Sequence, residues 1–267
     1  MTGLTSTLDG SENYTVFAPD NDAFAAFLAD NNFNSLSEVP VPLLTQVLLN
    51  HVQMGEIMAA DLSTGYISSM AKGSASDENL SMYINTSNGV MINGVATVTT
   101  ADIEADNGVI HAVDKVIGLP SVVTFALADP TFDTLVAALT REDDFTFVNT
   151  LMATGSPAPF TVFAPTNEAF ASLLSELEMD SLEDIPEDVL ASALSYHVVT
   201  EANVRSSALT DGMEVSTLAG QDFTVNLGDT AMITDANGRT ANIIVVDVQA
   251  NNGVVHVLDT VLLPASM

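Results

Sequence analysis

Cysteine is absent from the 267-residue chain, and this absence excludes several kinds of chemistry. Without a thiol there is no disulfide framework, no thiolate metal site and no cysteine nucleophile. Long apolar runs are lacking too, since stretches such as residues 122–128 and 243–246 fall far short of the roughly 20 residues that a membrane-spanning helix needs. A Gly-x-Ser-x-Gly elbow and a glycine-rich phosphate loop are also missing. We therefore expect no direct membrane insertion and no common nucleophilic or phosphate-transfer enzyme.

Basic residues are scarce. Only 5 Lys and Arg accompany 35 Asp and Glu, which gives a formal net charge of −30. Such a charge repels phosphate backbones and anionic lipid surfaces, so nucleic acid and bare membrane are poor partners. Divalent cations, basic proteins and neutral glycans remain open. The acidic residues are spread along the chain, which is typical of a solvated surface. Adaptation to salty water, as in a halophilic or marine microbe, is the alternative, and it predicts that NaCl raises thermal stability.

Two stretches of sequence recur in the second half of the chain. Residues 14–24 (YTVFAPDNDAF) return as residues 160–170 (FTVFAPTNEAF), and residues 108–114 return as residues 253–259. The four histidines occupy equivalent positions in the two copies: His51 with His197, and His111 with His256. Self-similarity over such a long period indicates two copies of one domain. The 47% share of hydrophobic residues indicates that both copies are globular.

We expect domain 1 to span residues 1–119 and domain 2 to span residues 120–267. Domain 2 opens with two helical patterns, residues 121–128 and a segment that starts at Asp129-Pro130. Domain 1 has no counterpart of them, so we expect it to lack its N-terminal helices. The first residues carry no signal-peptide pattern, which indicates either an intracellular protein or a segment trimmed from a longer one. The comparison of the two copies favours the trimmed segment.

Each copy then changes from helical to β patterns. A short strand, a turn and a helix are followed by an amphipathic helix that opens with Pro42 or Pro186, and then by period-two runs. Asn93-Gly94 and Asn237-Gly238 are typical of hairpin turns. We predict strands at 14–18 and 160–164, helices at 42–52 and 186–198, strands at 82–85, 90–92, 96–100, 223–227, 232–234 and 241–246, and closing strands at 109–117 and 254–263. Helices followed by hairpins indicate an α+β domain on an antiparallel sheet pair.

Three motifs occur in both copies: Thr-Val-Phe-Ala-Pro-x-Asn-x-Ala-Phe, a histidine in the middle of the domain, and Asn-Gly-Val-(Ile/Val)-His-x-(Val/Leu)-Asp. Together they resemble the fasciclin domain over nearly the whole chain. The resemblance implies two tandem fasciclin-like domains, each a wedge-shaped antiparallel β-sandwich flanked by helices. It also implies a secreted or membrane-anchored protein that mediates adhesion to cells or matrix, with no catalysis.

The same resemblance suggests which residues bind. For integrin-binding members of the family it implies an Asp-Ile pair before the closing motif and a Tyr-His pair in the central helix. Copy one has Asn50 where the aromatic residue is expected, and copy two has Val in place of Ile. The expected adhesion residues are Asp102, Ile103, Asp247, Val248, Tyr196 and His197. The alternative for the two acid-plus-aliphatic pairs is a strand edge whose Asp only caps the backbone or is solvated.

The histidines have a structural and a metal-binding interpretation. Those of the central helices lie on the apolar face, and those of the closing strands alternate with apolar residues, so we expect buried, hydrogen-bonded rings. The predicted structural residues are His51, His111, His256, Asn107, Gly108, Asn252 and Gly253. The rival interpretation is a zinc or copper site with one helix histidine and one strand histidine in each domain. Asp114 falls on the opposite face of a regular strand from His111, so we predict no metal and no cofactor.

We therefore predict a non-catalytic extracellular or cell-surface module that recognises a cell-surface or matrix protein, with polysaccharide as a further candidate partner. Two alternatives stay open: a glycan- or lipid-binding module of a biofilm matrix, and a metal-dependent hydrolase that uses His and Asp. A glycan array separates the first from protein adhesion. Elemental analysis for a stoichiometric transition metal identifies the second.

Overall fold

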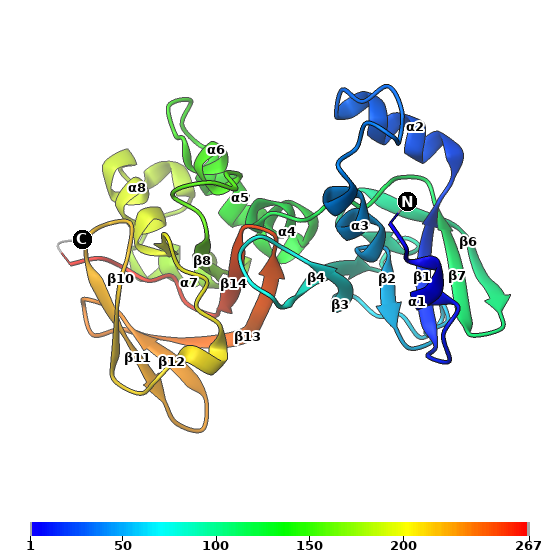
Figure 1. Ribbon diagram of the computed structural model, residues 1–267. Helices are drawn as coiled ribbons and strands as arrows, with labels where there is room; N and C mark the ends of the chain where they lie inside the picture. The colour runs from blue at the N-terminus through cyan, green and yellow to red at the C-terminus, as the bar shows by residue number, and fades with distance from the viewer. Residues whose placement is uncertain (1, 266–267) are drawn as a thin grey trace. The chain divides into compact units, whose positions relative to one another are not determined.

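The computed structural model describes residues 2–265, and the chain in it divides into two compact units. Unit 1 contains the residues up to 73 together with 77–120, and unit 2 contains residues 74–76 together with those from 121 onward. Both units combine helices with a seven-stranded arrangement (Figure 1). The chain is thus organised as two α+β units.

Unit 1 begins with a single helical turn and a strand, continues through two helices and ends in strands. Its elements are α1 (Thr5–Leu8), β1 (Tyr14–Pro19), α2 (Asn21–Asp30), α3 (Val41–Leu49), β2 (Val52–Met54), β3 (Gly65–Lys72), β4 (Asn79–Asn85), β5 (Met91–Ile92), β6 (Ala96–Ala105) and β7 (Gly108–Val113).

Unit 2 has the same order after an additional set of helices. Those helices are α4 (Val122–Ala128), η1 (Pro130–Phe132), α5 (Asp133–Leu139) and α6 (Phe147–Leu151). The remaining elements are β8 (Phe160–Pro165), α7 (Asn167–Glu176), η2 (Leu182–Asp184), α8 (Glu187–Tyr196), β9 (Val198–Val199), η3 (Ser206–Ala208), β10 (Met213–Ser216), β11 (Asp222–Leu227), β12 (Ala231–Thr234), β13 (Thr240–Ala250) and β14 (Gly253–Leu258).

The strand order is the same in both units. It is β2-β1-β7-β6-β5-β4-β3 in unit 1 and, read in the same direction, β9-β8-β14-β13-β12-β11-β10 in unit 2. The shared topology confirms that the sequence repeat is a repeat of fold. Pairing is antiparallel except between the first and last strands, β1 with β7 and β8 with β14, which are parallel. The hairpin patterns in the sequence predict antiparallel sheets, and they carry no information about two strands that lie at opposite ends of a domain.

Apolar side chains from the two layers of each sandwich form its core. In unit 1, Phe17 of β1 and Val113 of β7 pack in one cluster with Met82 and Ile84 of β4 and Ile92 of β5. Unit 2 has the equivalent cluster, with Phe163 against Phe223 at a centroid distance of 5.0 Å. Burial of these side chains is the main favourable term for each unit.

Helix starts follow the capping residues in the sequence. The Asp20 carboxylate accepts a hydrogen bond from the Ala23 amide at 2.7 Å, and the Thr166 hydroxyl accepts one from Ala169 at 3.2 Å. Ser121 begins α4 with a capping box. These side chains satisfy backbone amides that have no partner within their own helix. The acid and hydroxyl groups before these helices therefore have a structural use.

The units differ in what covers the outer face of their first and last strands. In unit 2, every residue of β8 and β14 is buried, and side chains of α4, α5 and α6 lie over Val162, Ala164 and Val255. In unit 1, the equivalent Val16 and Ile110 are only half-buried. The described part of unit 1 has one four-residue helix before β1 and no counterpart of α4–α6.

The closing strands are shorter than predicted. β7 ends at Val113 and β14 at Leu258, whereas the sequence predicted strands to residues 117 and 263. The apolar residues that follow leave the sheet and pack beneath the central helices, where Ile117 and Leu262 are buried. The burial predicted from this apolar pattern is confirmed, but the strand predicted beyond Val113 and Leu258 is wrong.

The two Asn-Gly pairs form different turns. Asn93 and Gly94 both have positive φ, at 50° and 68°, as a tight Asn-Gly turn requires, and the Val95 amide donates to the Ile92 carbonyl at 3.0 Å. At the second pair only Gly238 has positive φ, at 77°; its amide donates to the Asp235 carbonyl at 3.0 Å, and the Asp235 amide donates to the Arg239 carbonyl at 2.9 Å. The second hairpin therefore has a longer loop.

No single helix among residues 2–265 has the length and apolar composition needed to cross a membrane. The segments Val122–Ala128 and Pro130–Leu139 reach that length and composition only as a pair, and they are bent by 96° relative to each other.

Candidate functional site

A β-bulge places the predicted Asp-Ile pair at an equivalent point in each unit. Between Thr100 and Ile103, β6 has one residue more than the facing segment of β7, and β13 has the same excess between Val245 and Val248. Asp102 and Asp247 lie in these bulges with φ of 58° and 61°. Asp adopts this left-handed conformation more readily than most residues. Each bulge directs an acidic side chain out of the ladder.

One oxygen of the Asp102 carboxylate is hydrogen-bonded within unit 1, and the other is accessible to a partner. Its Oδ1 accepts a hydrogen bond from the Ala59 amide at 2.8 Å, which fixes the loop after β2. Its Oδ2 accepts no hydrogen bond from the described residues, and the side chain is 37% exposed. Ile103 next to it is 42% exposed. Unit 1 therefore presents a carboxylate oxygen beside an exposed aliphatic side chain.

Asp247 is engaged within unit 2. Its Oδ1 accepts from the Ser206 amide at 2.7 Å and its Oδ2 accepts from the Ser206 hydroxyl at 2.6 Å. Arg205 adds an ion pair at 3.4 Å, and the Asp247 side chain is only 18% exposed. In unit 1 the residue before Ala59 is Met58, so this cation has no equivalent there. The duplicated acid is thus neutralised in one unit and accessible in the other.

Val248 is only 2% exposed and offers no side-chain surface to a partner. The exposed aliphatic residues of unit 2 instead precede the bulge, at Ile244, Val245 and Val246, which are 52%, 38% and 42% exposed. The equivalent stretch of unit 1, residues 99–101, is Thr-Thr-Ala. The periodicity of a regular strand gave no sign that three consecutive residues are exposed.

Tyr196 and His197 are buried, at 0% and 4% exposure. The Tyr196 hydroxyl donates to the Asp222 carbonyl at 2.7 Å and accepts from the Ala236 amide at 3.1 Å, which joins α8 to the start of β11 and to the turn between β12 and β13. Burial raises the pKa of Tyr196 to about 12. Neither side chain reaches the surface. In copy one, Asn50 takes the tyrosine position, is buried, and donates to the Gly118 carbonyl at 2.9 Å.

The two helix histidines join the end of each central helix to the C-terminal segment of its unit. Nδ1–H of His51 donates to the Val47 carbonyl at 2.7 Å, and its Nε2 accepts from the Ile117 amide at 2.8 Å. His197 repeats the pattern with Ala193 at 2.7 Å and Leu262 at 2.9 Å. These partners require the neutral Nδ1–H tautomer.

The two strand histidines join each bulge to a loop. Nε2–H of His111 donates to the Ile57 carbonyl at 2.9 Å, and its Nδ1 accepts from the Asp102 amide at 3.2 Å. His256 makes the same contacts with Val204, at 2.8 Å, and with the Asp247 amide, at 3.4 Å. The backbone partners specify the opposite tautomer, Nε2–H. These rings help to hold the bulges that carry the acids.

Burial lowers the pKa of three of the rings, those of His51, His197 and His256. It lowers the pKa of His51 and of His197 from 6.5 to about 4, although a backbone carbonyl at Nδ1 opposes the shift in each case. Burial also lowers the pKa of His256. Both ring nitrogens of every histidine already have backbone partners. Among the described residues, no three His, Asp or Glu side chains converge as a metal site would require.

The Asn-Gly motif before each closing strand is a close-packed corner. A Cβ on Gly108 would lie 1.9 Å from the Tyr14 carbonyl oxygen, and one on Gly253 would lie 2.3 Å from that of Phe160. Asn252 donates to the Leu151 and Ala153 carbonyls, both at 2.8 Å, and accepts from the Val122 amide at 3.0 Å. Asn107 donates to carbonyls of the segment before β1, the shortest contact being 2.7 Å to Leu8. Only glycine fits beside the first strand, and the asparagine fixes the chain that precedes it.

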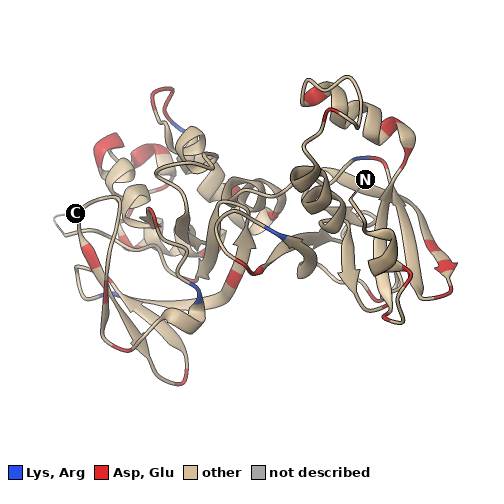
Figure 2. Ribbon diagram, viewed as in Figure 1, with Lys and Arg blue, Asp and Glu red and all other residues tan. Residues whose placement is uncertain are grey.

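Acidic residues far outnumber basic residues in both units (Figure 2). The arginines are used internally: Arg141 donates to the Leu182 and Ile185 carbonyls, and Arg239 pairs with Glu176 at 2.7 Å and Asp235 at 3.4 Å. With Arg205 committed to Asp247, all three arginines stabilise unit 2. The surface is left strongly acidic.

Comparison with known proteins agrees with this geometry. The family model of the fasciclin domain matches residues 1–120 and 130–264. The chain belongs to the fasciclin-domain family, and its fold is a tandem of two fasciclin domains.

The relatives include proteins of animals and of a fungus. The chain is 31% identical over 266 residues to pig transforming growth factor-beta-induced protein ig-h3, covering 98% of this chain and 36% of that protein. It is 31% identical over 272 residues to human periostin, covering 98% and 30%. A fasciclin-like arabinogalactan protein of the fungus Arthroderma benhamiae is 26% identical over 278 residues, covering 96% and 60%. The chain spans about a third of the length of the first two relatives.

A solved structure shares the fold. The fasciclin domain pair of the insect cell adhesion molecule Fasciclin I superposes with a TM-score of 0.56 over 94% of this chain and 88% of that one. The sequence identity of 19% means that this likeness concerns the fold alone.

Proposed function

We propose that this chain is a non-catalytic adhesion module of an extracellular or cell-surface protein and that it binds a surface or matrix protein. The carrying observation is the bulge of unit 1, where the free Oδ2 of Asp102 lies beside the exposed Ile103. An ionised oxygen supplies a strong, directional acceptor, and an adjacent aliphatic group supplies burial. The family membership supports the same class of function.

Unit 2 contributes differently. Asp247 is neutralised by Arg205 and capped by Ser206, so recognition there depends on the exposed aliphatic residues 244–246. Exposed apolar surface of this kind is typical of protein contacts. The buried Val248, Tyr196 and His197 act, in this proposal, only by supporting the surface. A neutral polysaccharide remains the second candidate partner, since the net charge of −30 does not oppose it.

Attachment of cells and of purified matrix components to surfaces coated with the protein tests this proposal. The double variant Asp102→Asn/Ile103→Thr removes the charge and the aliphatic surface. Asn keeps an acceptor for the Ala59 amide and tolerates the positive φ, so the bulge is preserved. We expect at least a tenfold loss of attachment. Full attachment by the folded double variant would remove these two residues from the binding surface.

A matched control is available in unit 2. Asp247→Asn makes the same chemical change at the equivalent bulge. It breaks an internal ion pair, whereas Asp102→Asn removes an accessible charge. We expect it to change stability more than attachment. A glycan array run alongside separates the protein partner from the polysaccharide.

A further inference from the structure

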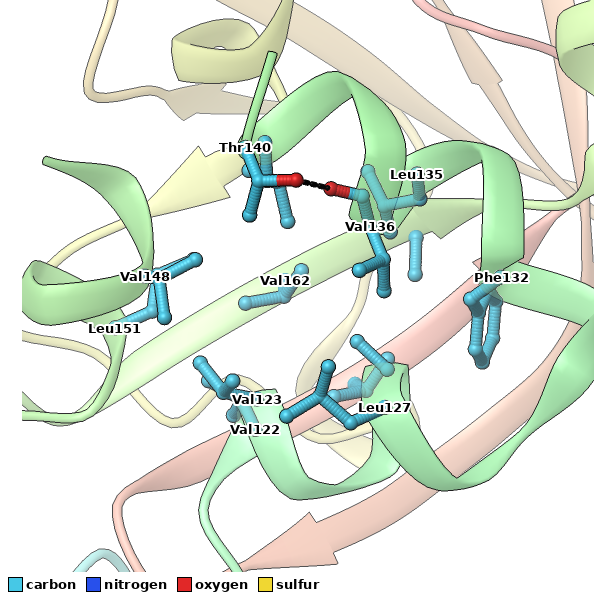
Figure 3. A pocket seen from close by; sticks show the side chains of 14 residues that line it. Val122, Val123, Leu127, Phe132, Leu135, Val136, Thr140, Val148, Leu151 and Val162 are labelled. Carbon is cyan, nitrogen blue, oxygen red and sulfur yellow. Dashed lines mark hydrogen bonds between the residues drawn. The ribbon is translucent and has the colours of Figure 1, made fainter. Parts of the chain in front are cut away.

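Unit 2 contains an apolar pocket of about 100 Å³ between α4, α5, α6 and the sheet, here called the helix pocket (Figure 3). Its floor includes Val162 and Ala164 of β8 and Val255 of β14, all buried. The three helices cover the outer face of these strands without filling the space above it. An engineered apolar cavity of comparable size, about 150 Å³, stays dry and binds benzene.

The chemistry of the lining excludes recognition of a polar group. Thr140 is the single polar side chain among the lining residues, and its hydroxyl donates to the Val136 carbonyl at 2.8 Å (Figure 3). The other lining side chains are aliphatic or, at Phe132, aromatic. A polar or charged group inside the pocket would lose its hydration without gaining a partner. The occupant must therefore be hydrocarbon.

The pocket opens to solvent through side chains that are not fully buried. Leu127 is 66% exposed, and Val136 and Val148 are half-buried. Figure 3 shows Leu127 on α4, Val136 on α5 and Val148 on α6 around the space. Exposed aliphatic residues around an apolar depression gain free energy when a hydrocarbon covers them. A hydrocarbon chain can enter the pocket here while the helices stay folded.

The segment next to this opening is acidic. Thr140 is followed by Arg141 and then by Glu142, Asp143 and Asp144 in the loop between α5 and α6. Arg141 is occupied, because it pairs with Glu142 at 2.6 Å and donates to two backbone carbonyls. The charge left beside the opening is negative. A carboxylate or phosphate head group would be repelled, and a cationic one attracted.

We propose that the helix pocket binds the alkyl chain of a small amphiphile whose head group is neutral or cationic. The alkyl chain breaks no polar contact when it enters the pocket, and the head group stays outside it, beside the acidic loop of residues 142–144. This function is separate from the adhesion surface of unit 1, since all the lining residues belong to unit 2. The two proposals can therefore fail independently.

Three probes with the same chain and different head groups test the proposal: 1-octanol, octylammonium and octanoate. Each probe is titrated into the full chain. Isothermal calorimetry and methyl NMR should both show saturable binding at one site. Octylammonium and octanol should bind at least tenfold more tightly than octanoate at low salt. Within an alcohol series, affinity should rise by about fourfold per methylene until the pocket is full. The absence of saturable binding, or octanoate binding as tightly as octylammonium, would overturn the proposal.

Substitutions locate the site. Val136→Phe fills the opening and should weaken octanol binding at least tenfold, whereas Val41→Phe is the same change at an exposed helix position of unit 1 and should have no effect. Nuclear Overhauser contacts between the octanol methyl group and the methyls of Val136 and Val148 in the unsubstituted protein give a readout that does not depend on variant folding. Contacts elsewhere, or equal binding by both variants, would contradict the assignment.

Discussion

Single residues explain why the repeated motifs are so alike in the two copies. The four histidines, the two Asn-Gly corners and the Thr-Val-Phe-Ala-Pro strands all fix backbone segments to one another. From the sequence one could predict that these rings are buried and hydrogen-bonded, because they lie on apolar faces. Their tautomers and partners could not be predicted, since both depend on backbone groups brought close only by the fold.

The accessible acid of the candidate site was only partly predictable. The motif located Asp102 and Asp247, but the predicted strands ended before them, at residues 100 and 246, whereas β6 and β13 continue past them to Ala105 and Ala250. The bulge arises from the pairing of β6 with β7, and the hydrogen bond from Ala59 to Asp102 and the ion pair of Arg205 with Asp247 each join residues about 40 positions apart. The binding role of Asp102 and Ile103 stays a prediction.

Stability should depend on pH through the buried histidines. The folded-state pKa of His51 and of His197 is about 4, below the value of 6.5 that applies to an unfolded chain. The stabilisation is therefore complete above about pH 6.5 and is lost as the pH falls toward 4. We expect the unfolding free energy to decrease by about 1 kcal/mol per pH unit for each of the two rings in this window.

Urea unfolding at pH 7, 6 and 5 in 0.5 M NaCl measures this effect with surface charge screened. The variant His51→Asn/His197→Asn should be less stable throughout but should show a flatter pH dependence. Stability that rises from pH 7 to pH 5 would show that these rings are not held neutral.

Substituting the glycine of either Asn-Gly corner by a residue with a side chain should lower the stability of the fold. Gly108→Ala places a Cβ against the Tyr14 backbone in a conformation with φ of 144°, so we expect a loss of about 3 kcal/mol or more. Gly118→Ala in the same unit meets nothing within 4 Å and should lie within about 1 kcal/mol of the parent. Chemical denaturation of the two variants makes the comparison, and equal stabilities would refute the close approach.

At the scale of elements, the sequence predicted most helices and strands because their periodicity is strong. It missed α1, α6, the short helices η2 and η3, and the strands β2, β3, β9 and β10, and the predicted helices 42–52 and 186–198 wrongly extended into β2 and β9. β3 and β10 lie at the end of the strand order, where one side of a strand has no neighbour and the sequence pattern is weak. α6 has only five residues, too few to display a helical period. The parallel pairing of first and last strands was missed because it connects the two ends of each domain.

Asn252 should hold the helices α4 and α6 on the sheet. Its side chain is 1% exposed and makes three hydrogen bonds to the backbone of the helical segment. We expect Asn252→Ala to cost about 2–4 kcal/mol, since each bond contributes roughly 0.5–1.5 kcal/mol and buried groups lose their partners. Asn107→Ala, whose partners lie in a more exposed segment, should cost less. Hydrogen exchange in residues 122–151 checks the result, and unchanged protection there would contradict it.

For the whole molecule, duplication has produced two units with the same topology. The helices α4, α5 and α6 cover the outer face of the first and last strands in unit 2, and the described part of unit 1 has no counterpart of them. β8 and β14 are buried throughout, whereas Val16 and Ile110 on the same face of unit 1 are half-buried. We expect unit 1 to unfold at a lower temperature than unit 2, because it buries less apolar surface per residue. Hydrogen exchange with peptide resolution during a thermal ramp distinguishes the units, and simultaneous loss of protection would contradict this expectation.

The net charge of −30 should make stability depend on salt. Exposed carboxylates repel one another over distances that are screened at high ionic strength, where the Debye length falls from about 10 Å at 0.1 M to about 3 Å at 1 M. We expect the thermal midpoint to rise markedly between these NaCl concentrations. A flat response would reject the halophilic interpretation.

The central claim is that all four histidines are used to hold the fold, which leaves the surface for binding. Long-range 15N NMR of the imidazoles at pH 8, with and without equimolar zinc, tests it most directly. The account predicts Nδ1–H tautomers for His51 and His197, Nε2–H tautomers for His111 and His256, and no change with zinc. Rings that exchange tautomers, or that shift together when zinc is added, would contradict it.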